Sequence, residues 1–205
     1  MITVSNGVLT VIEACDKVRI TKGKQSYHAD VSGAAQLPLP FGDGVYTVDV
    51  LEQTRPGYYR ILKTRVLQAT SANGYMLAPN QYVPCTPAWD FARLEAGDKT
   101  GMAAYKAIRK WVSKSIAYDY VKAATVPKKG VIPDPLTVWQ THLGICQDIA
   151  SLMVGMLRAV GVPSRLVIGR ANGRLHAWVE AVIDQKVYRY DPSGGSGSYT
   201  RERWY

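Results

Sequence analysis

The hydrophobic period of the chain changes partway along, and this change constrains the fold more than any other feature of the sequence. From residue 8 to about residue 69, short apolar runs such as VYTVDVLE alternate with polar residues and are broken by Gly, Pro, Asn and Asp. Alternation with a period of two, bounded by such residues, is typical of antiparallel strands. We therefore expect a small, sandwich-like, all-β region here, with about five to seven strands.

The second part of the chain is patterned for helices. After an irregular segment at residues 71–90, apolar residues recur three or four positions apart over residues 101–116, which predicts an amphipathic helix. Asp134 with a proline directly after it is a typical helix start. It predicts a short helix with Leu136, Trp139 and Leu143 on its inner side.

A further helix is predicted from Cys146 onward. Gly161 is placed to cap its C-terminus, and Pro163 prevents continuation. Cys146 then lies at a helix N-terminus, where unpaired N–H groups and the positive end of the helix dipole favour a thiolate over a thiol and can bind an oxyanion. The apolar stripe of this helix consists of Ile149, Leu152, Met153, Met156, Leu157 and Val160.

The remaining residues predict a meander of strands. Two dipeptides, Asn172-Gly173 and Asp184-Gln185, mark tight turns between apolar runs. The GGSGS run at residues 194–198 predicts a flexible link to the C-terminal residues. If Asp184 and Gln185 form a two-residue loop, the opposed residues include Glu180 with Arg189, an opposite-charge pair, and Val179 with Tyr190.

The same register brings a histidine and an aspartate together. His176 and Asp191 become diagonal neighbours on one face, with Cα atoms on the order of 7–8 Å apart, so the carboxylate can accept the imidazole N–H. A shift of one residue would place them on opposite faces. With Cys146 they supply the nucleophile, base and orienting group of thiol acyl-transfer enzymes. The alternative for Cys146 is a buried structural thiol, since free cysteine is among the most buried residue types.

Composition argues against several other classes of protein. Three cysteines without C-x-x-C spacing and scattered histidines predict neither a disulfide framework nor a metal site, and Cys85 is expected to be a packing residue. The formal charge of +9 divides into +2 over residues 1–88 and +7 over residues 89–205, but the charges are scattered singly. Nucleic acid is therefore not expected as a partner. No glycine-rich loop opens a helix, and no cofactor is expected.

The sequence also bears on location. No basic leader followed by an apolar run opens it, and no window reaches the roughly 18 apolar residues of a membrane span. We expect no membrane span and a reducing, cytoplasmic location, although a leader removed ahead of residue 1 would leave secretion open. The oligomeric state is not predicted.

Three blocks of the second part, GICQDIASLMVGMLRAVGVPSRLVIG, HAWVEAVI and VYRYDPS, resemble the transglutaminase-like superfamily in their order and spacing. The resemblance covers roughly residues 100–195. It implies an α+β fold with a papain-like core, in which the nucleophile helix packs on an antiparallel sheet. By position, it makes Cys146 the nucleophile, His176 the base and Asp191 its orienting partner.

The resemblance does not extend to residues 1–88, which the alternating pattern predicts to be a β-rich N-terminal domain. It implies that residues 89–205 form a transglutaminase-like catalytic core, and it implies an activity. The activity would be acyl transfer from amide bonds of a protein or peptide substrate. Hydrolysis by a cysteine protease or amidase is favoured, since no calcium-binding D-x-[DN]-x-[DN]-G loop is present. The alternatives are a protein-glutamine crosslinking transglutaminase, an acyltransferase acting on a cofactor-borne acyl group, and a binding scaffold without turnover.

Three more residues are candidates for the oxyanion site or the cleft. Tyr118 lies where the family often has an aromatic residue in the cleft, and its hydroxyl could donate to an oxyanion. Gln147 follows the nucleophile in the first helical turn, and Trp178 shares the predicted face of His176. Core packing is the alternative for Tyr118 and Trp178. Asp148 could cap the helix, but its charge would also oppose a thiolate.

Overall fold

The computed structural model describes the chain except residues 6, 32, 40, 71–74, 76–78, 85–89, 128–130, 196 and 205. Cys85 therefore lies outside the described residues, and its predicted role in packing stays a prediction. The chain divides into two compact units: Met1–Gln81 with Pro127–Ile132, and Tyr82–Val126 with Pro133–Tyr205. The predicted domain boundary between residues 88 and 89 also stays a prediction, because it falls beside residues that are not described.

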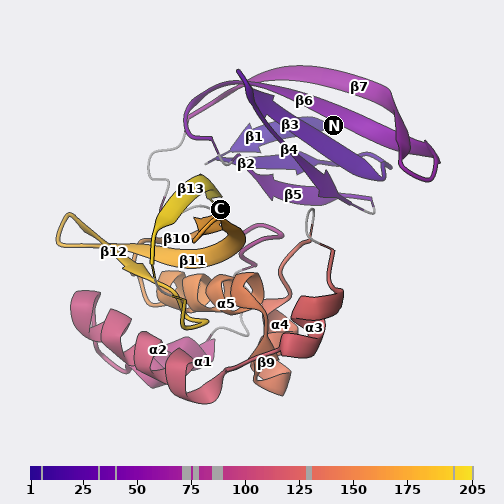
Figure 1. The fold of residues 1–205 in the computed structure, drawn as a ribbon. Coiled ribbons are helices and arrows are strands. Elements are labelled where there is room, and N and C mark those ends of the chain that lie inside the picture. The colour runs from indigo at the N-terminus through magenta and orange to yellow at the C-terminus, as the bar shows by residue number, and fades with distance from the viewer. Residues whose placement is uncertain are drawn as a thin grey trace. The chain divides into compact units, whose positions relative to one another are not determined.

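The first unit contains two antiparallel sheets (Figure 1). The smaller sheet has the order β1-β2-β5 and consists of β1 (Ile2–Ser5), β2 (Val8–Val11) and β5 (Ala35–Pro38). The larger sheet has the order β4-β3-β6-β7 and consists of β3 (Lys17–Lys22), β4 (Gln25–Asp30), β6 (Gly44–Arg55) and β7 (Tyr58–Ala69). These strands confirm the predicted all-β region.

The alternation in β6 explains which face of the larger sheet is buried. Tyr46, Val48 and Val50 are fully buried, while Val45 is 56% exposed. A bulge after Val50 then shifts the register with β7, so that the next residue, Leu51, is buried as well. Asp49, between Val48 and Val50, is also buried, at 5% exposed, so burial alternates only as far as Val48.

The second unit has one central helix on a four-stranded sheet (Figure 1). α5 (Cys146–Ala159) contacts both central strands of the sheet, and α1 (Asp90–Ala96), α2 (Gly101–Ser115) and α4 (Pro135–Thr141) pack against it. This is the predicted helix-on-sheet α+β core. The sheet has the order β12-β11-β10-β13, with all pairs antiparallel, and consists of β10 (Ser164–Ala171), β11 (Arg174–Ile183), β12 (Lys186–Tyr190) and β13 (Tyr199–Trp204).

α5 is buried on more sides than its apolar stripe predicts. Ala150 and Val154, which lie outside the stripe, are fully buried as well. The helix ends as expected, because Gly161 adopts a left-handed φ of 76° and the next residue, Val162, donates its N–H to the Leu157 carbonyl at 2.8 Å. A helix enclosed in this way gives its first residue a fixed position.

Two residues predicted to face inward lie at the surface instead. Leu136 is 40% exposed and Leu143 is 45% exposed, so this part of the sequence prediction is wrong. α4 has only seven residues, and its buried side chains are those of Pro135 and Val138. Leu143 lies beyond the helix, because His142 turns the chain with a left-handed φ of 59°.

Two short elements complete the second unit before α5 begins. β8 (Ala117–Tyr118) and β9 (Leu143–Gly144) form a two-residue parallel bridge, and α3 (Tyr120–Thr125) follows β8. Parallel pairing brings the end of α2 beside the start of α5, although the two are about thirty residues apart in sequence.

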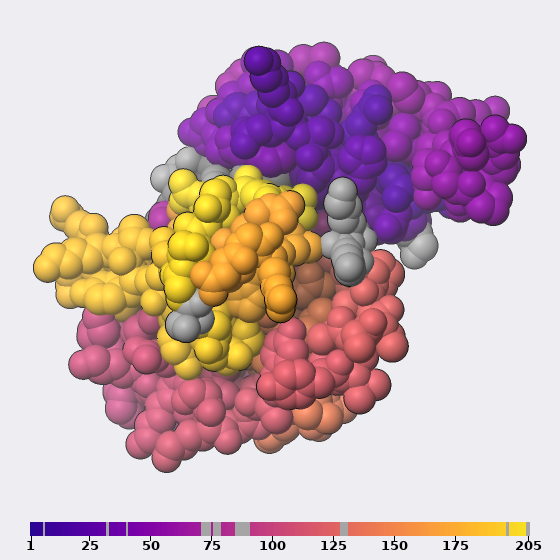
Figure 2. Space-filling model, in the orientation of Figure 1, coloured from indigo at the N-terminus to yellow at the C-terminus, as the bar shows by residue number. Residues whose placement is uncertain are grey.

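The C-terminal residues form a strand that the sequence analysis does not predict, and they lie at the surface of the second unit (yellow in Figure 2). β13 pairs with β10, and the pairing shifts register between Ile168 and Gly169. Gly169 permits this close approach, because an added Cβ would lie 2.1 Å from the backbone oxygen of Thr200. The glycine-rich run before β13 is therefore a connection between two strands of one sheet.

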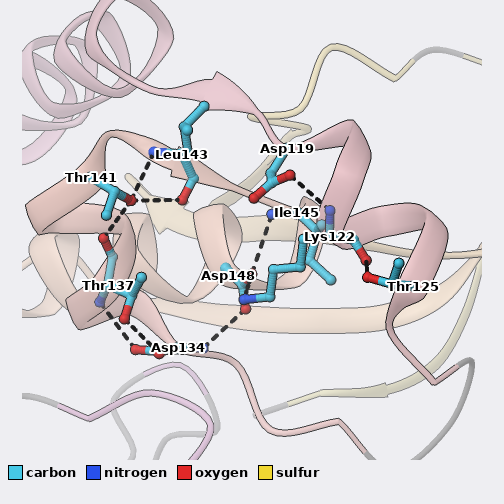
Figure 3. Close-up of polar contacts among 9 residues, drawn as sticks. All are labelled: Asp119, Lys122, Thr125, Asp134, Thr137, Thr141, Leu143, Ile145 and Asp148. Atoms are coloured by element: carbon cyan, nitrogen blue, oxygen red, sulfur yellow. Dashed lines mark hydrogen bonds and ion pairs between the residues drawn. The ribbon is translucent and has the colours of Figure 1, made fainter.

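A buried carboxylate holds the N-terminus of α5 (Figure 3). Asp148 is fully buried and accepts the backbone N–H groups of Ile145, at 3.2 Å, and Asp134, at 3.0 Å. Its third partner is the ammonium group of Lys122 in α3, with Nζ at 2.6 Å. Asp148 thus ties α3, the start of α4 and the N-cap of α5 together, and Lys122 supplies the opposite charge that a buried carboxylate needs.

Replacing Asp148 with Ala should therefore lower the free energy of unfolding by about 3 kcal/mol, since a buried ion pair loses one partner and two backbone N–H groups lose their acceptor. Urea denaturation measures this change. Asp98→Ala is the matched control, because Asp98 is exposed and its replacement should cost less than about 0.5 kcal/mol. Equal stability of the two variants would contradict the anchoring role of Asp148.

Candidate active site

Cys146 is the first helical residue of α5 and directly follows the parallel bridge. Gly144, two residues before it, lies so close to its neighbours that an added Cβ would be 2.6 Å from Cγ2 of Val138. A glycine at this position therefore lets the chain enter α5 without displacing α4. Cys146 itself is half-buried, so its sulfur is not enclosed in the core.

The predicted register of β11 and β12 is confirmed. Asp184 and Gln185 both adopt left-handed φ values, 50° and 62°, as a two-residue hairpin turn requires. The opposed residues are those that the sequence predicts, including Glu180 with Arg189 and Val179 with Tyr190.

This register brings His176 and Asp191 together as expected. Nε2 of His176 lies 2.5 Å from Oδ2 of Asp191, and the two side chains are 18% and 4% exposed. The carboxylate thus occupies one ring nitrogen of the imidazole and fixes the orientation of the ring.

Two more residues complete the surroundings of Asp191. Ser193 donates its backbone N–H and its hydroxyl to Oδ1, at 2.9 and 2.6 Å. The hydroxyl of Tyr199 in β13 donates to Oδ2 at 3.0 Å. Sequence reasoning missed both residues. The only available signal was the DPS sequence after β12, typical of a turn closed by an aspartate side chain, and nothing marked Tyr199.

The charge state of His176 follows from its neighbours. Burial by itself lowers the pKa of His176, but hydrogen bonds to Asp191 and to Cys146, with the negative charges of both, raise it to about 10. His176 is therefore protonated near neutral pH. The hydrogen bond between His176 and Cys146 places the sulfur beside the imidazole ring.

Asp191 and Tyr199 are shifted in opposite directions. Burial raises the pKa of the Asp191 carboxyl, yet hydrogen bonds from His176 and Ser193 outweigh this effect and lower the pKa to about 2. Burial and the hydrogen bond to Asp191 raise the pKa of Tyr199 to about 12. Tyr199 therefore stays a neutral donor to a carboxylate that is ionised over the physiological range.

Tyr118 lies beside Cys146. The parallel bridge pairs Tyr118 with Gly144 and thereby places the tyrosine at the start of α5. Burial and the negative charge of Cys146 raise the pKa of Tyr118, while a hydrogen bond from the Cys146 backbone N–H opposes the rise. The side chain of Tyr118 therefore contacts the cysteine.

Gln147 and Trp178 are placed differently. Trp178 is fully buried, packs edge-on against the Tyr199 ring at 5.1 Å, and directs its indole N–H toward the Glu180 carboxylate at 3.4 Å. It therefore lies in the core beneath the histidine. Nε2 of Gln147 is buried and, among the residues that the structure describes, has no hydrogen-bond partner. It is an unused donor in the first turn of α5.

Among the described residues, no three His, Cys, Asp or Glu side chains are grouped so that they could hold a metal ion. Within the same part of the chain, no helix has both the length and the apolar character needed to cross a membrane.

Residues 91–192 match the model of the Transglutaminase-like superfamily. An uncharacterised protein of Mycobacterium leprae is 27% identical over 157 residues, a match that covers 69% of this chain and 54% of that protein. The chain thus spans about half the length of this curated relative.

The fold is similar to that of solved structures. A candidate cysteine protease from Cytophaga hutchinsonii is 15% identical, with a TM-score of 0.52 and coverage of 96% of this chain and 78% of that one. Red sea bream transglutaminase is 11% identical with a TM-score of 0.43, over 92% of this chain and 48% of that one. The likeness to the Cytophaga hutchinsonii structure is a likeness of fold alone. Residues 91–192 of the chain thus belong to the transglutaminase-like superfamily.

Proposed function

We propose that this protein is a thiol enzyme that cleaves amide bonds in proteins or peptides through Cys146, His176 and Asp191. The observation that carries the proposal is the environment of His176, which is hydrogen-bonded to Asp191 and interacts with Cys146. A thiol, an imidazole and a carboxylate in this order are the machinery of thiol acyl transfer. Membership of the transglutaminase-like superfamily supports the same chemistry.

The proposed reaction requires a Cys146 thiolate beside a protonated His176. His176 carries its proton at neutral pH, because its pKa is raised to about 10. The positive charge of the imidazolium and the N-terminal end of α5 both stabilise a negative sulfur. Asp191 engages Nε2, so Nδ1 is the ring nitrogen left to face the sulfur.

In the first half-reaction, the thiolate attacks the carbonyl carbon of the amide, and the carbonyl oxygen becomes an oxyanion. N–H groups of the first turn of α5 and the hydroxyl of Tyr118 are the candidate donors to that oxygen. The C–N bond then breaks as His176 gives its proton to the leaving amine nitrogen. The products are a free amine and a thioester on Cys146.

In the second half-reaction, His176 takes a proton from water as the water oxygen attacks the thioester. The C–S bond breaks, a carboxylic acid leaves, and the thiolate is regenerated. A primary amine in place of water would give a new amide, which is the crosslinking alternative. Mass analysis of the products, with and without an added primary amine, separates the two outcomes.

Alkylation tests the thiolate directly. At pH 6.5, iodoacetamide should modify Cys146 at least about tenfold faster than Cys15, because an ordinary thiol is almost entirely protonated at this pH. Burial and neighbouring carboxylates raise the pKa of Cys15, which makes it the internal reference. His176→Ala should lower the alkylation rate of Cys146 about tenfold, as read by peptide mass spectrometry.

The matched control for that experiment is His142→Ala. His142 is an exposed histidine at the C-cap of α4, and its loss should leave the alkylation rate of Cys146 unchanged. A slow reaction at Cys146 in the parent protein would count against the enzyme and in favour of a binding scaffold.

Turnover is the second test of the proposal. Against a panel of fluorogenic peptides, Cys146→Ala should lack hydrolysis, and Asp191→Asn should lower kcat by roughly 10²- to 10⁴-fold, since the imidazole loses its orienting charge. Tyr199→Phe removes one of several donors to Asp191 and should cost less than about tenfold. Undiminished hydrolysis by Cys146→Ala would refute the proposed nucleophile.

Stability should also depend on pH through the His176–Asp191 pair. The folded pKa of His176, about 10, lies above its ordinary 6.5, so its stabilisation is full below about pH 6.5 and is lost as pH rises toward 10. The folded pKa of Asp191, about 2, lies below its ordinary 3.8, so its stabilisation is present above about pH 3.8 and is lost as pH falls toward 2. The pair therefore stabilises the fold most between about pH 3.8 and pH 6.5.

Urea midpoints at pH 6 and pH 9 measure the alkaline part of this dependence. Asp191→Asn should remove most of the decrease that the pair causes, whereas the exposed control Asp98→Asn should retain it. The same decrease in both variants would show that the pair does not control stability in this range.

A further inference from the structure

A surface cavity adjoins the His176–Asp191 pair. It has a volume of about 380 Å³ and is lined by Arg189, Tyr190, Asp191, Gly194, Gly195 and Tyr199. Gly195 brings the cavity wall against the pair itself, because an added Cβ at this residue would lie 2.2 Å from Oδ2 of Asp191 and 3.1 Å from Nε2 of His176. A molecule in this cavity would therefore lie next to the groups that the proposed reaction uses.

Two arginines are stacked on the tyrosines of this cavity. The guanidinium carbon of Arg189 lies 5.1 Å from the centre of the Tyr199 ring, and that of Arg109 in α2 lies 4.3 Å from the centre of the Tyr190 ring. Both arginines are exposed. Stacking on an aromatic ring orients a guanidinium while its N–H donors stay available to a ligand.

Neither arginine has a carboxylate partner among the described residues, although the strand register offers one to Arg189. Glu180 lies opposite Arg189, but its carboxylate is 2.8 Å from Arg165 and 3.6 Å from Arg201. The predicted ion pair between Glu180 and Arg189 is therefore not formed. Asp191 is also engaged, by donors from three other residues.

Arg189 therefore gives the cavity a cation that has no counter-ion among the described residues. The two glycines in the wall present backbone without side chains, which leaves room for close approach of a ligand. A planar, bidentate acceptor is the natural partner of such a guanidinium.

We propose that this cavity binds the carboxylate of an acidic side chain in the substrate through Arg189, so that the enzyme prefers amide bonds close to a glutamate or aspartate. The proposal rests on the proposed amide cleavage and adds its substrate class. Arg189 is a specificity residue here and takes no part in the chemical steps. Arg109 adds to the positive charge near Tyr190.

The test uses pairs of fluorogenic peptides that differ only in Glu or Gln at one position, scanned over the three positions on each side of the scissile bond. At one of these positions, the parent protein should cleave the Glu peptide with a kcat/KM about tenfold higher than that of its Gln partner. Arg189→Gln should remove this preference through KM, and Arg189→Lys should keep part of it. Cleavage of the Gln peptide by each variant serves as the reference rate for that variant.

Lys186→Gln is the matched control, because Lys186 is an exposed cation of the same strand that does not line the cavity. It changes the net charge equally and should retain the preference for Glu. Equal cleavage of every Glu and Gln pair by the parent protein would overturn the proposal. So would an equal loss of preference in Lys186→Gln, since that would indicate a general effect of charge.

A binding measurement separates this proposal from the proposed function. Cys146→Ala protein, mixed with the same fluorescent peptides, should bind the preferred Glu peptide about tenfold more tightly than its Gln partner in fluorescence anisotropy. Arg189→Gln in this background should equalise the two. If no peptide is cleaved but this pattern is found, the proposed function fails and the carboxylate site stands. If the two peptides bind alike, the carboxylate site is overturned.

Discussion

The candidate active site depends on the carboxylate of Asp191, on which donors from three segments converge. His176 in β11, Ser193 in the turn after β12 and Tyr199 in β13 all reach its two oxygens. A carboxylate that is only 4% exposed is costly unless it is paired and fully hydrogen-bonded, and here it is both. The charge that orients the histidine therefore also fixes the turn and holds β13 to its place. Gly195 belongs to the same arrangement, because no side chain fits there beside Asp191.

A second buried carboxylate, Asp148, stands two residues after Cys146. It fixes the first turn of α5, and its charge is opposed by that of Lys122 at 2.6 Å. The ammonium of Lys122 thus offsets the charge by which Asp148 would oppose a thiolate. Asp191, the other acid of the candidate site, is paired with His176.

The sequence predicted those parts of the site that depend on local patterns. The register of β11 and β12 follows from a two-residue turn and from alternation, both of which can be read within about fifteen residues. Once that register is known, the approach of His176 and Asp191 follows. The contacts that sequence reasoning missed join residues that are far apart in the chain. Lys122 and Asp148 are 26 residues apart, and no local period relates them.

β13 was missed for a different reason. Glycine and serine before it have the composition of a flexible linker, and composition does not reveal that the strand after them pairs with β10 about thirty residues earlier. The inward residues of α4 were misassigned because a helix of seven residues buries too little to follow a full apolar stripe. In both cases tertiary packing, rather than the local pattern, decides the outcome.

The position of β13 also explains why Arg189 has no carboxylate partner among the described residues. Arg201 in this strand lies 3.6 Å from Glu180, whose carboxylate already pairs with Arg165, so the residue opposite Arg189 is engaged elsewhere. The same strand supplies Tyr199, which donates to Asp191 through its hydroxyl and lies under the Arg189 guanidinium. One strand thus supports the carboxylate beside the histidine and lines the adjoining cavity. In the proposed function, substrate selection and orientation of the base would then share a structural cause, because a change that displaces Tyr199 removes a donor from Asp191 and the aromatic ring from Arg189 together.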